Sequence, residues 1–258
     1  MKYLSLLFIL VSQLLPGQTA TKVTAIPLDA DSFIGTDSYK NLYFIKDKVL
    51  KKQGEEGVFS FNDYQLGNIT SVDIINPLKI VVFYQSVNTV VLLDNKLNEI
   101  ERINFNHQAN FMNISTATNA GNNQLWIFNM DTQQLELYNY RTQRKQLVSQ
   151  PITGKLIAQA SNFNYCFLLS EGKLRVFNVY GSLLNEMESS GFQKMAQHNE
   201  NLVVSKGNDL FFISENSINP LKVQLTENMV KDLHLTQDLL YIYDGINIHT
   251  YSLTQPKQ

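Results

Sequence analysis

The stretch KIVVFYQSVNTVVLLD, at residues 79–94, contains two short apolar runs, and the same pattern returns without a gap as QLWIFNMDTQQLELYN at residues 124–139. In this alignment Ile80–Phe83 matches Leu125–Phe128. The runs are short and rich in Val, Ile, Tyr and Phe, and turn-forming residues bound them, which is typical of β-strands rather than helices. We therefore interpret each pair of runs as a β-hairpin.

A pair of this kind occurs six times along the chain. The first strand of each pair is centred on Leu42, Ile80, Leu125, Cys166, Leu202 and Leu240. By subtraction, the steps between these centres are 38, 45, 41, 36 and 38 residues. A period of this length is a signature of propeller blades, in which four-stranded sheets surround a central axis.

One further strand before each hairpin and one after it would bring each unit to four strands. Five such outer strands are expected at Val58–Phe61, Glu101–Phe105, Gln146–Gln150, Leu184–Glu188 and Leu221–Leu225. The sixth copy lacks one, whereas a strand-like stretch, Val23–Leu28, precedes the first copy. Because an open sheet edge invites aggregation, we expect this stretch to complete the last blade. The predicted fold class is therefore all-β: a six-bladed β-propeller of four-stranded antiparallel blades, closed by an N-terminal strand.

The N-terminal segment differs from the rest of the chain. Lys2 is followed by an apolar stretch and then by small or polar residues ending in Ala20, which is the pattern of a secretory signal peptide. The apolar stretch is too short to span a membrane. We expect a signal peptide at residues 1–20, cleaved after Gln18 or Ala20, and a single β-propeller domain at residues 21–258. The expected location is periplasmic or secreted, and no lipobox cysteine lies near the cleavage region.

Composition argues against several classes of function. The formal net charge is −2 and the sequence pI is about 6.1, so the chain lacks the electrostatic footprint of a nucleic-acid-binding protein. The longest basic cluster, Arg141–Lys145, is interpreted as a solvated turn. The single cysteine, Cys166, cannot form an internal disulfide and has no neighbouring base that would activate it as a nucleophile.

Side chains on the innermost strands would meet at the axis of the ring. Asp31, Asp73 and Asp232 lie on or beside those strands and could bind a metal or act as acid and base in a hydrolase or lyase. They precede their blade centres by 11, 7 and 8 residues, so they share no register, and solvation of strand edges explains them. His198 and His234 are also out of register and lack the spacing of metal ligands. We predict no catalytic residue, no metal site and no cofactor.

The unit of two paired strands, a polar turn and a further strand, as in VVLLDNKLNEI at residues 90–100, resembles the blade repeat of six-bladed propellers of the NHL and quinoprotein-like broad class. The resemblance covers residues 23–258. The Asp-box turns of sialidases and the Gly-His and Trp-Asp pairs of WD repeats do not occur in the sequence. The signal segment, the Asn-rich turns and the Ile, Lys and Tyr content are similar to small exported envelope proteins of Bacteroidota.

Propellers without site residues commonly present a rigid rim to other proteins. We therefore expect a non-enzymatic exported scaffold for protein–protein interaction in the cell envelope, an accessory subunit of an outer-membrane or type 9 secretion assembly. Its expected partners are envelope proteins, with no nucleic acid and no membrane span. Two alternatives remain open: a propeller that binds a glycan or small ligand in its axial pocket, and a hydrolase or lyase with axial carboxylates.

The predicted binding face is formed by the loops that join successive blades. The longest of these loops follows the second blade and accounts for the step of 45 residues. Its candidate binding residues are Phe105, His107, Phe111 and Met112.

Overall fold

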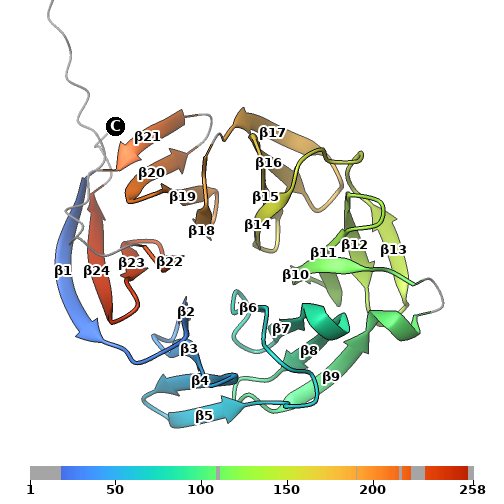
Figure 1. Ribbon diagram of the computed structural model, residues 1–258, viewed down its shortest axis with the longest axis horizontal. Coiled ribbons are helices and arrows are strands. Elements are labelled where there is room, and N and C mark those ends of the chain that lie inside the picture. The colour runs from blue at the N-terminus through green and yellow to red at the C-terminus, as the bar shows by residue number, and fades with distance from the viewer. Residues whose placement is uncertain (1–18, 109–110, 190, 215–216, 222–229, 255–258) are drawn as a thin grey trace, which may run out of the picture.

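The computed structural model describes residues 19–108, 111–189, 191–214, 217–221 and 230–254. These residues form six four-stranded sheets arranged as a ring around a central axis (Figure 1). Every strand pairing within the sheets is antiparallel. The six-bladed β-propeller predicted from the repeat is therefore confirmed.

Blade 1 consists of β2 (Ser32–Thr36), β3 (Leu42–Lys46), β4 (Val49–Gly54) and β5 (Gly57–Phe61). Blade 2 consists of β6 (Ser71–Asp73), β7 (Ile80–Tyr84), β8 (Thr89–Leu93) and β9 (Glu99–Asn104). Blade 3 consists of β10 (Ile114–Gly121), β11 (Gln124–Asn129), β12 (Gln134–Asn139) and β13 (Arg144–Leu147). Blade 4 consists of β14 (Leu156–Ser161), β15 (Tyr165–Ser170), β16 (Lys173–Asn178) and β17 (Leu183–Glu188). Blade 5 consists of β18 (Lys194–His198), β19 (Asn201–Lys206), β20 (Asp209–Ser214) and β21 (Ser217–Leu221). Blade 6 consists of β22 (Asp232–Leu235), β23 (Leu239–Tyr243), β24 (Asn247–Thr254) and β1 (Thr19–Pro27). Two short 3₁₀ helices, η1 (Gln85–Val87) and η2 (Phe105–His107), lie in connections.

The last blade is built from both ends of the described chain. β1 is its outermost strand and pairs with β24, with Ala25 opposite His249 and Pro27 opposite Asn247. In Figure 1 the blue β1 lies beside the red β24. The predicted closure of the ring is confirmed, and the closing strand begins at Thr19, which is earlier than the predicted Val23.

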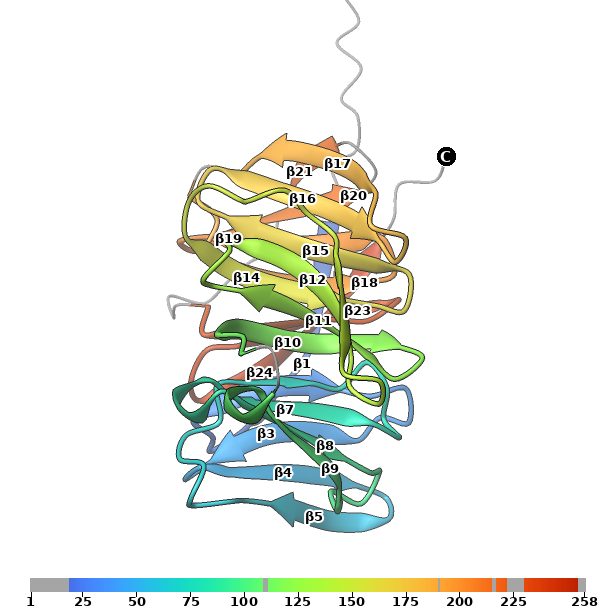
Figure 2. The same cartoon turned by 90° about the vertical axis from the view of Figure 1, so that its right-hand side faces the viewer.

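Each middle strand packs against both neighbouring blades, because alternate side chains of a strand point to opposite faces of the sheet. In β11, Leu125 and Ile127 belong to the core cluster shared with blade 2, whereas Trp126 and Phe128 belong to the cluster shared with blade 4. Six such clusters occupy the six junctions between blades. The second strands of the blades, such as β7 and β11, therefore read as nearly continuous apolar runs. Figure 2 shows from the side how the sheets stack face to face.

Two outer strands differ from their predicted positions. The strand expected at Gln146–Gln150 forms at Arg144–Leu147, and all four of its residues are exposed. The strand expected at Leu221–Leu225 forms at Ser217–Leu221, with Ser217 opposite Ser214, and residues 222–225 lie outside the described part of the chain. An outer strand has one sheet face and one edge open to solvent, so apolar residues do not mark its position.

Closure of the ring can be tested by removing β1. Deletion of residues 1–27 would remove the eight residue pairs between β1 and β24 and expose the outer edge of blade 6 to solvent. At about 0.5–1.5 kcal/mol for each hydrogen bond, we expect the free energy of unfolding to fall by about 3 kcal/mol or more in urea denaturation. Deletion of residues 1–18 keeps β1 and is the matched control. Equal stability of the two truncated proteins would contradict the role assigned to β1.

Candidate functional site

Two cavities open along the axis and meet at its centre. The first, of about 700 Å³, is lined by residues of all six innermost strands and by turns that follow them, including Ser38 and Gln237; we call it the turn-side cavity. The second, of about 550 Å³, opens toward the loops that join blades 2, 3 and 4; we call it the loop-side cavity. Both are lined by Asp73 and Gln159, so these residues mark the middle of the channel.

Asp73 and Asp232 connect adjacent blades. Asn119 of blade 3 donates its backbone N–H to Asp73 Oδ2 over 2.7 Å, and Ile75 donates to Asp73 Oδ1 over 2.9 Å. In the same way, Phe33 of blade 1 donates its backbone N–H to Asp232 Oδ2 over 2.9 Å. Each carboxylate thus joins its innermost strand to that of the next blade, where no sheet hydrogen bonds are made.

Burial governs the titration of both carboxyls. Desolvation raises the pKa of Asp73 to about 6, although the N–H donors of Asn119 and Ile75 act in the opposite direction. Desolvation also raises the pKa of Asp232, against the N–H of Phe33. Asp73 nevertheless keeps partial solvent access from the channel.

The three aspartates considered for catalysis do not form a group. Asp31 is exposed and accepts the backbone N–H of Asp47 over 2.7 Å, so it stabilises the hairpin turn of blade 1. Asp73 lines the channel, whereas neither Asp31 nor Asp232 lines either cavity. Among the described residues, no cluster of three or more His, Cys, Asp or Glu side chains is arranged to hold a metal ion.

The two histidines line the turn-side cavity. His234 Nε2 lies 2.9 Å from the Thr36 carbonyl oxygen of blade 1, which can only accept, so this geometry assigns the proton to Nε2. Desolvation lowers the pKa of His234 to about 4, although the bond to Thr36 opposes the shift. Desolvation also lowers the pKa of His198, with Asp238 opposing. Both rings are therefore neutral at pH 7.

His234 also packs closely against blade 1. Its ring meets Phe33 edge to face, with the ring centroids 6.3 Å apart, and lies 5.8 Å from the Tyr241 ring. At Gly35, which has φ +149°, a Cβ atom would lie 2.3 Å from His234 Nδ1. Only glycine leaves room for the imidazole at this junction.

Two other candidates from the sequence have structural surroundings that explain them. Cys166 is buried, and burial raises the pKa of its thiol well above the ordinary value, which disfavours the thiolate. In the basic cluster, Arg141 lies 3.2 Å from Glu101 and Lys145 lies 3.0 Å from Glu136. Carboxylates thus neutralise both residues locally.

The four predicted binding residues separate into two pairs. Phe105 and Met112 are buried in the cluster between blades 2 and 3, where the Phe105 ring lies 5.1 Å from that of Tyr138. These two side chains anchor the ends of the loop in the core, so neither is available at the surface. Phe111 and His107 are exposed and remain available for contact.

The opposite end of the ring carries exposed apolar side chains that sequence reasoning missed. Tyr39, Leu78 and Phe163 are 71%, 63% and 47% exposed, and each lies in the turn after the innermost strand of a blade. Their neighbours Ser38, Lys40, Pro77 and Ser161 line the turn-side cavity. We call these three residues and their turns the turn face. The sequence feature that could have identified these residues is a single large apolar residue between turn-forming residues, as in Asn162-Phe163-Asn164.

No protein-family model matches the chain, and no curated protein matches it. Solved structures do match. Virginiamycin B lyase from Staphylococcus aureus, in a catalytically inactive form with quinupristin, is 9% identical with a TM-score of 0.60, and the match covers 90% of this chain and 99% of that chain. The Cps50 (Swd1) propeller domain of Myceliophteria thermophila is 10% identical, with a TM-score of 0.61 and coverage of 91% and 100%. A chain of the mitotic checkpoint complex is 10% identical, with a TM-score of 0.63 and coverage of 91% and 95%. At such identities these likenesses show the propeller fold alone.

Substitution Asp73→Asn should change how stability depends on pH. The pKa of Asp73 rises on folding from 3.8 to about 6, so between these values the native state binds more protons and this carboxyl lowers stability as the pH rises. His234 acts in the opposite sense, because its pKa falls from 6.5 to about 4. We expect the unfolding free energy of D73N to rise more steeply than that of the wild type from pH 4 to pH 6, by up to about 3 kcal/mol.

Urea titrations at several pH values would measure this difference. Asp31→Asn is the matched control, because Asp31 is exposed and its amide oxygen can still accept the N–H of Asp47. A D73N profile parallel to that of the wild type would show that Asp73 does not titrate as described.

Substitution Gly35→Ala should weaken the junction between blades 6 and 1. The added methyl group would overlap His234, and we expect a loss of about 2 kcal/mol or more in the free energy of unfolding. Gly57→Ala separates this overlap from backbone strain, because Gly57 also has positive φ (+117°) but no atom within 4 Å of the added Cβ. If chemical denaturation gave equal losses for the two variants, close packing at Gly35 would not be the cause.

Proposed function

We propose that this chain is a non-enzymatic interaction module that binds an envelope protein on its turn face. The observation that carries the proposal is the set of exposed apolar side chains, Tyr39, Leu78 and Phe163, on short turns around the mouth of the turn-side cavity. Exposed aromatic side chains, tyrosine above all, are enriched among the hot spots of protein interfaces. Rigid turns also reduce the entropy lost on binding.

The surroundings of the axial groups favour binding over catalysis. Both oxygens of Asp73 accept backbone N–H groups, and the His234 ring is held by Thr36 and Phe33. A general acid or base needs a polar atom that can reach the substrate. These side chains instead use their polar atoms to join blades, which supports a non-enzymatic role.

The envelope location rests on the N-terminal pattern of a charged residue, an apolar stretch and small residues before Ala20. Among the described residues, no helix has the length and apolar content that crossing a membrane requires. The proposed setting is periplasmic or secreted, as an accessory subunit of an outer-membrane or type 9 secretion assembly. That a similar propeller comes from a protein complex, the mitotic checkpoint complex, agrees with a role in assembly.

The turn face is preferred to the loop face as the docking surface. On the loop face, Tyr64 and Phe111 are also exposed, but each lies four or more residues along the sequence from any residue that lines a cavity, whereas Tyr39, Leu78 and Phe163 lie within two. On the turn face the apolar residues flank a cavity of about 700 Å³. A projecting loop of the partner, with an apolar tip, would fit such a surface.

Substitution of Tyr39, Leu78 and Phe163 by Ser should abolish partner binding without unfolding the propeller. Each side chain is exposed, so we expect little change in thermal midpoint, whereas loss of three interface anchors at about 1–2 kcal/mol each should weaken binding at least 100-fold. The measurement is co-purification of the tagged protein from its native envelope, followed by titration of the purified partner.

The matched control carries serine at Tyr64 and Phe111, which changes the opposite face. We expect this control to bind as tightly as the wild type. Retained binding by the turn-face variant would reject the proposal, and loss of binding in the control alone would assign the interface to the loop face.

A further inference from the structure

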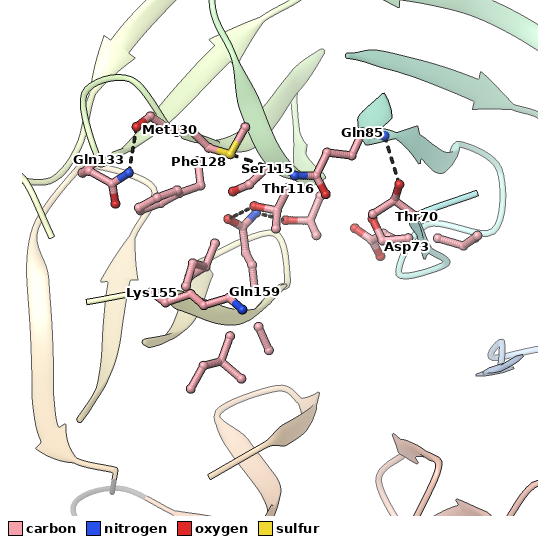
Figure 3. Close-up of a pocket in the computed structure, with 16 residues that line it drawn as sticks. Thr70, Asp73, Gln85, Ser115, Thr116, Phe128, Met130, Gln133, Lys155 and Gln159 are labelled. Carbon is pink, nitrogen blue, oxygen red and sulfur yellow. Dashed lines mark hydrogen bonds between the residues drawn. The ribbon is translucent and has the colours of Figure 1, made fainter. Parts of the chain in front are cut away.

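The loop-side cavity has the features of a small-molecule site that is separate from the turn face. It lies between blades 2, 3 and 4, and Figure 3 shows side chains from these blades converging on it. Its volume of about 550 Å³ falls within the range of roughly 300–1,000 Å³ typical of ligand pockets. Most of its polar groups are hydroxyls and amides, from Thr70, Ser71, Gln85, Ser115, Thr116, Thr118, Gln133 and Gln159.

One amide in the cavity wall is held in a fixed orientation. Gln159 Oε1 accepts a hydrogen bond from the Thr116 hydroxyl over 2.7 Å, and Gln159 Nε2 lies 2.9 Å from Thr118 Oγ1. The same nitrogen donates to the Trp126 carbonyl oxygen over 3.1 Å. Figure 3 shows this group at the centre of the wall. Both N–H donors of Gln159 are used within the wall, so a ligand would meet the remaining acceptor capacity of Gln159 Oε1 in a fixed orientation, which favours specific binding.

Other polar groups in the wall have hydrogen-bonding capacity left over. The Gln85 amide is exposed, and its hydrogen bond is to the Met130 sulfur at 3.9 Å, which is a weak acceptor. Ser115 Oγ is enclosed and has no hydrogen-bond partner within the described structure. A polar ligand would offer the Gln85 amide better partners than the Met130 sulfur, whereas an apolar ligand would leave this amide unpaired.

Among the described lining residues, Lys155 supplies a positive charge and Asp73 a negative one. The Lys155 ammonium forms no ion pair with any residue that the structure describes, and in Figure 3 its side chain extends toward Gln159. Asp73 is the carboxylate among the described lining residues, and each of its oxygens already accepts a backbone N–H. A cationic ligand would have to share Asp73 with these donors, whereas the Lys155 ammonium is available to an anionic group. A phosphate ester, with a charge near −2, usually requires an arginine cluster or several backbone donors.

We propose that the loop-side cavity binds a hydroxylated monocarboxylate, with the carboxylate at Lys155 and the hydroxyls at Gln85 and Gln159. Sugar acids such as uronic acids have this chemistry. They occur free or as units of a polysaccharide, and the two sources present the same groups to the cavity. The site is independent of the turn face, so the proposed protein partner can be wrong while this site is right.

Calorimetric or NMR titration with defined probes tests this site. The probes are galacturonic acid, digalacturonic acid, galactose, galactose 6-phosphate and cyclohexanecarboxylate. We expect galacturonic acid to bind at least about tenfold more tightly than galactose and galactose 6-phosphate, which lack the single charge, and than cyclohexanecarboxylate, which lacks the hydroxyls, because one charge-assisted hydrogen bond is worth about that factor. Tighter binding of digalacturonic acid would indicate a polysaccharide source, and tighter binding of the monosaccharide a free sugar acid.

Two variants locate the site. Lys155→Gln removes the charge and Gln85→Leu removes an exposed amide, and we expect each to weaken binding of the preferred acid about tenfold or more without changing the thermal midpoint. Lys48→Gln is the matched control, because Lys48 is an exposed lysine in a turn of blade 1 that lines neither cavity.

Absence of saturable binding by either uronic acid would overturn the proposal. Equal binding of galactose would refute the role of Lys155, and equal binding of cyclohexanecarboxylate would refute recognition of the hydroxyls. Tighter binding of the sugar phosphate would replace the monocarboxylate with a dianion. Unchanged binding by both K155Q and Q85L would place the ligand elsewhere.

Discussion

The pairing of β1 with β24 is the constraint on which the ring depends. Each blade buries its two faces only against its neighbours, so an open ring would leave one face of blade 1 and one face of blade 6 in water. The cluster at this junction includes Leu28 and Phe33 from the start of the chain and Tyr243 and Ile248 from its end. The Tyr243 hydroxyl also donates to the Ala30 carbonyl oxygen over 2.8 Å. Closure therefore combines a backbone ladder with a buried junction.

Near the axis, hydrogen bonds of polar side chains connect neighbouring blades. There the innermost strands of neighbouring blades approach one another without forming a sheet, and side chains of one strand bond to the backbone of the next. Asp73, Asp232 and His234 all act in this way. Ser161 and Gln197 add similar bonds to the Asn119 and Ser161 carbonyl oxygens. The groups that looked most like catalytic candidates are thus held by neighbouring blades, and the side chains left free for recognition lie toward the two mouths of the channel.

Local sequence pattern was enough to predict the blades and the closing strand, and prediction of strand position failed where an outer strand is exposed. Burial of both faces makes β7 and β8 continuously apolar, and this visible pattern identified the blades. The polar residue after the third strand was also informative, since Asp94 accepts the backbone N–H groups of Lys96 and Asn98 and so turns the chain. The exposed strand β13 carries no comparable signal.

The site was harder to predict, because its hydrogen bonds join residues far apart in the sequence. The bond from Asn119 to Asp73 joins residues 46 positions apart, and that from Phe33 to Asp232 joins residues 199 positions apart, so neither can be inferred from spacing. The loop residues Phe105 and Met112 looked like a binding surface because they are apolar in an insertion, yet apolar residues in an insertion also anchor it to the core. Exposure, which separates them from Phe111, depends on the packed structure.

Native-state hydrogen exchange of the β1 amides tests the central claim most directly. If closure by β1 and β24 holds the ring together, the hydrogen-bonded amides in the middle of β1, around Thr24 and Ala25, should exchange only through openings as rare as those that expose buried β8. Rapid exchange of those β1 amides while β8 stays protected would show that the ring remains folded without its closing strand, and would contradict the account.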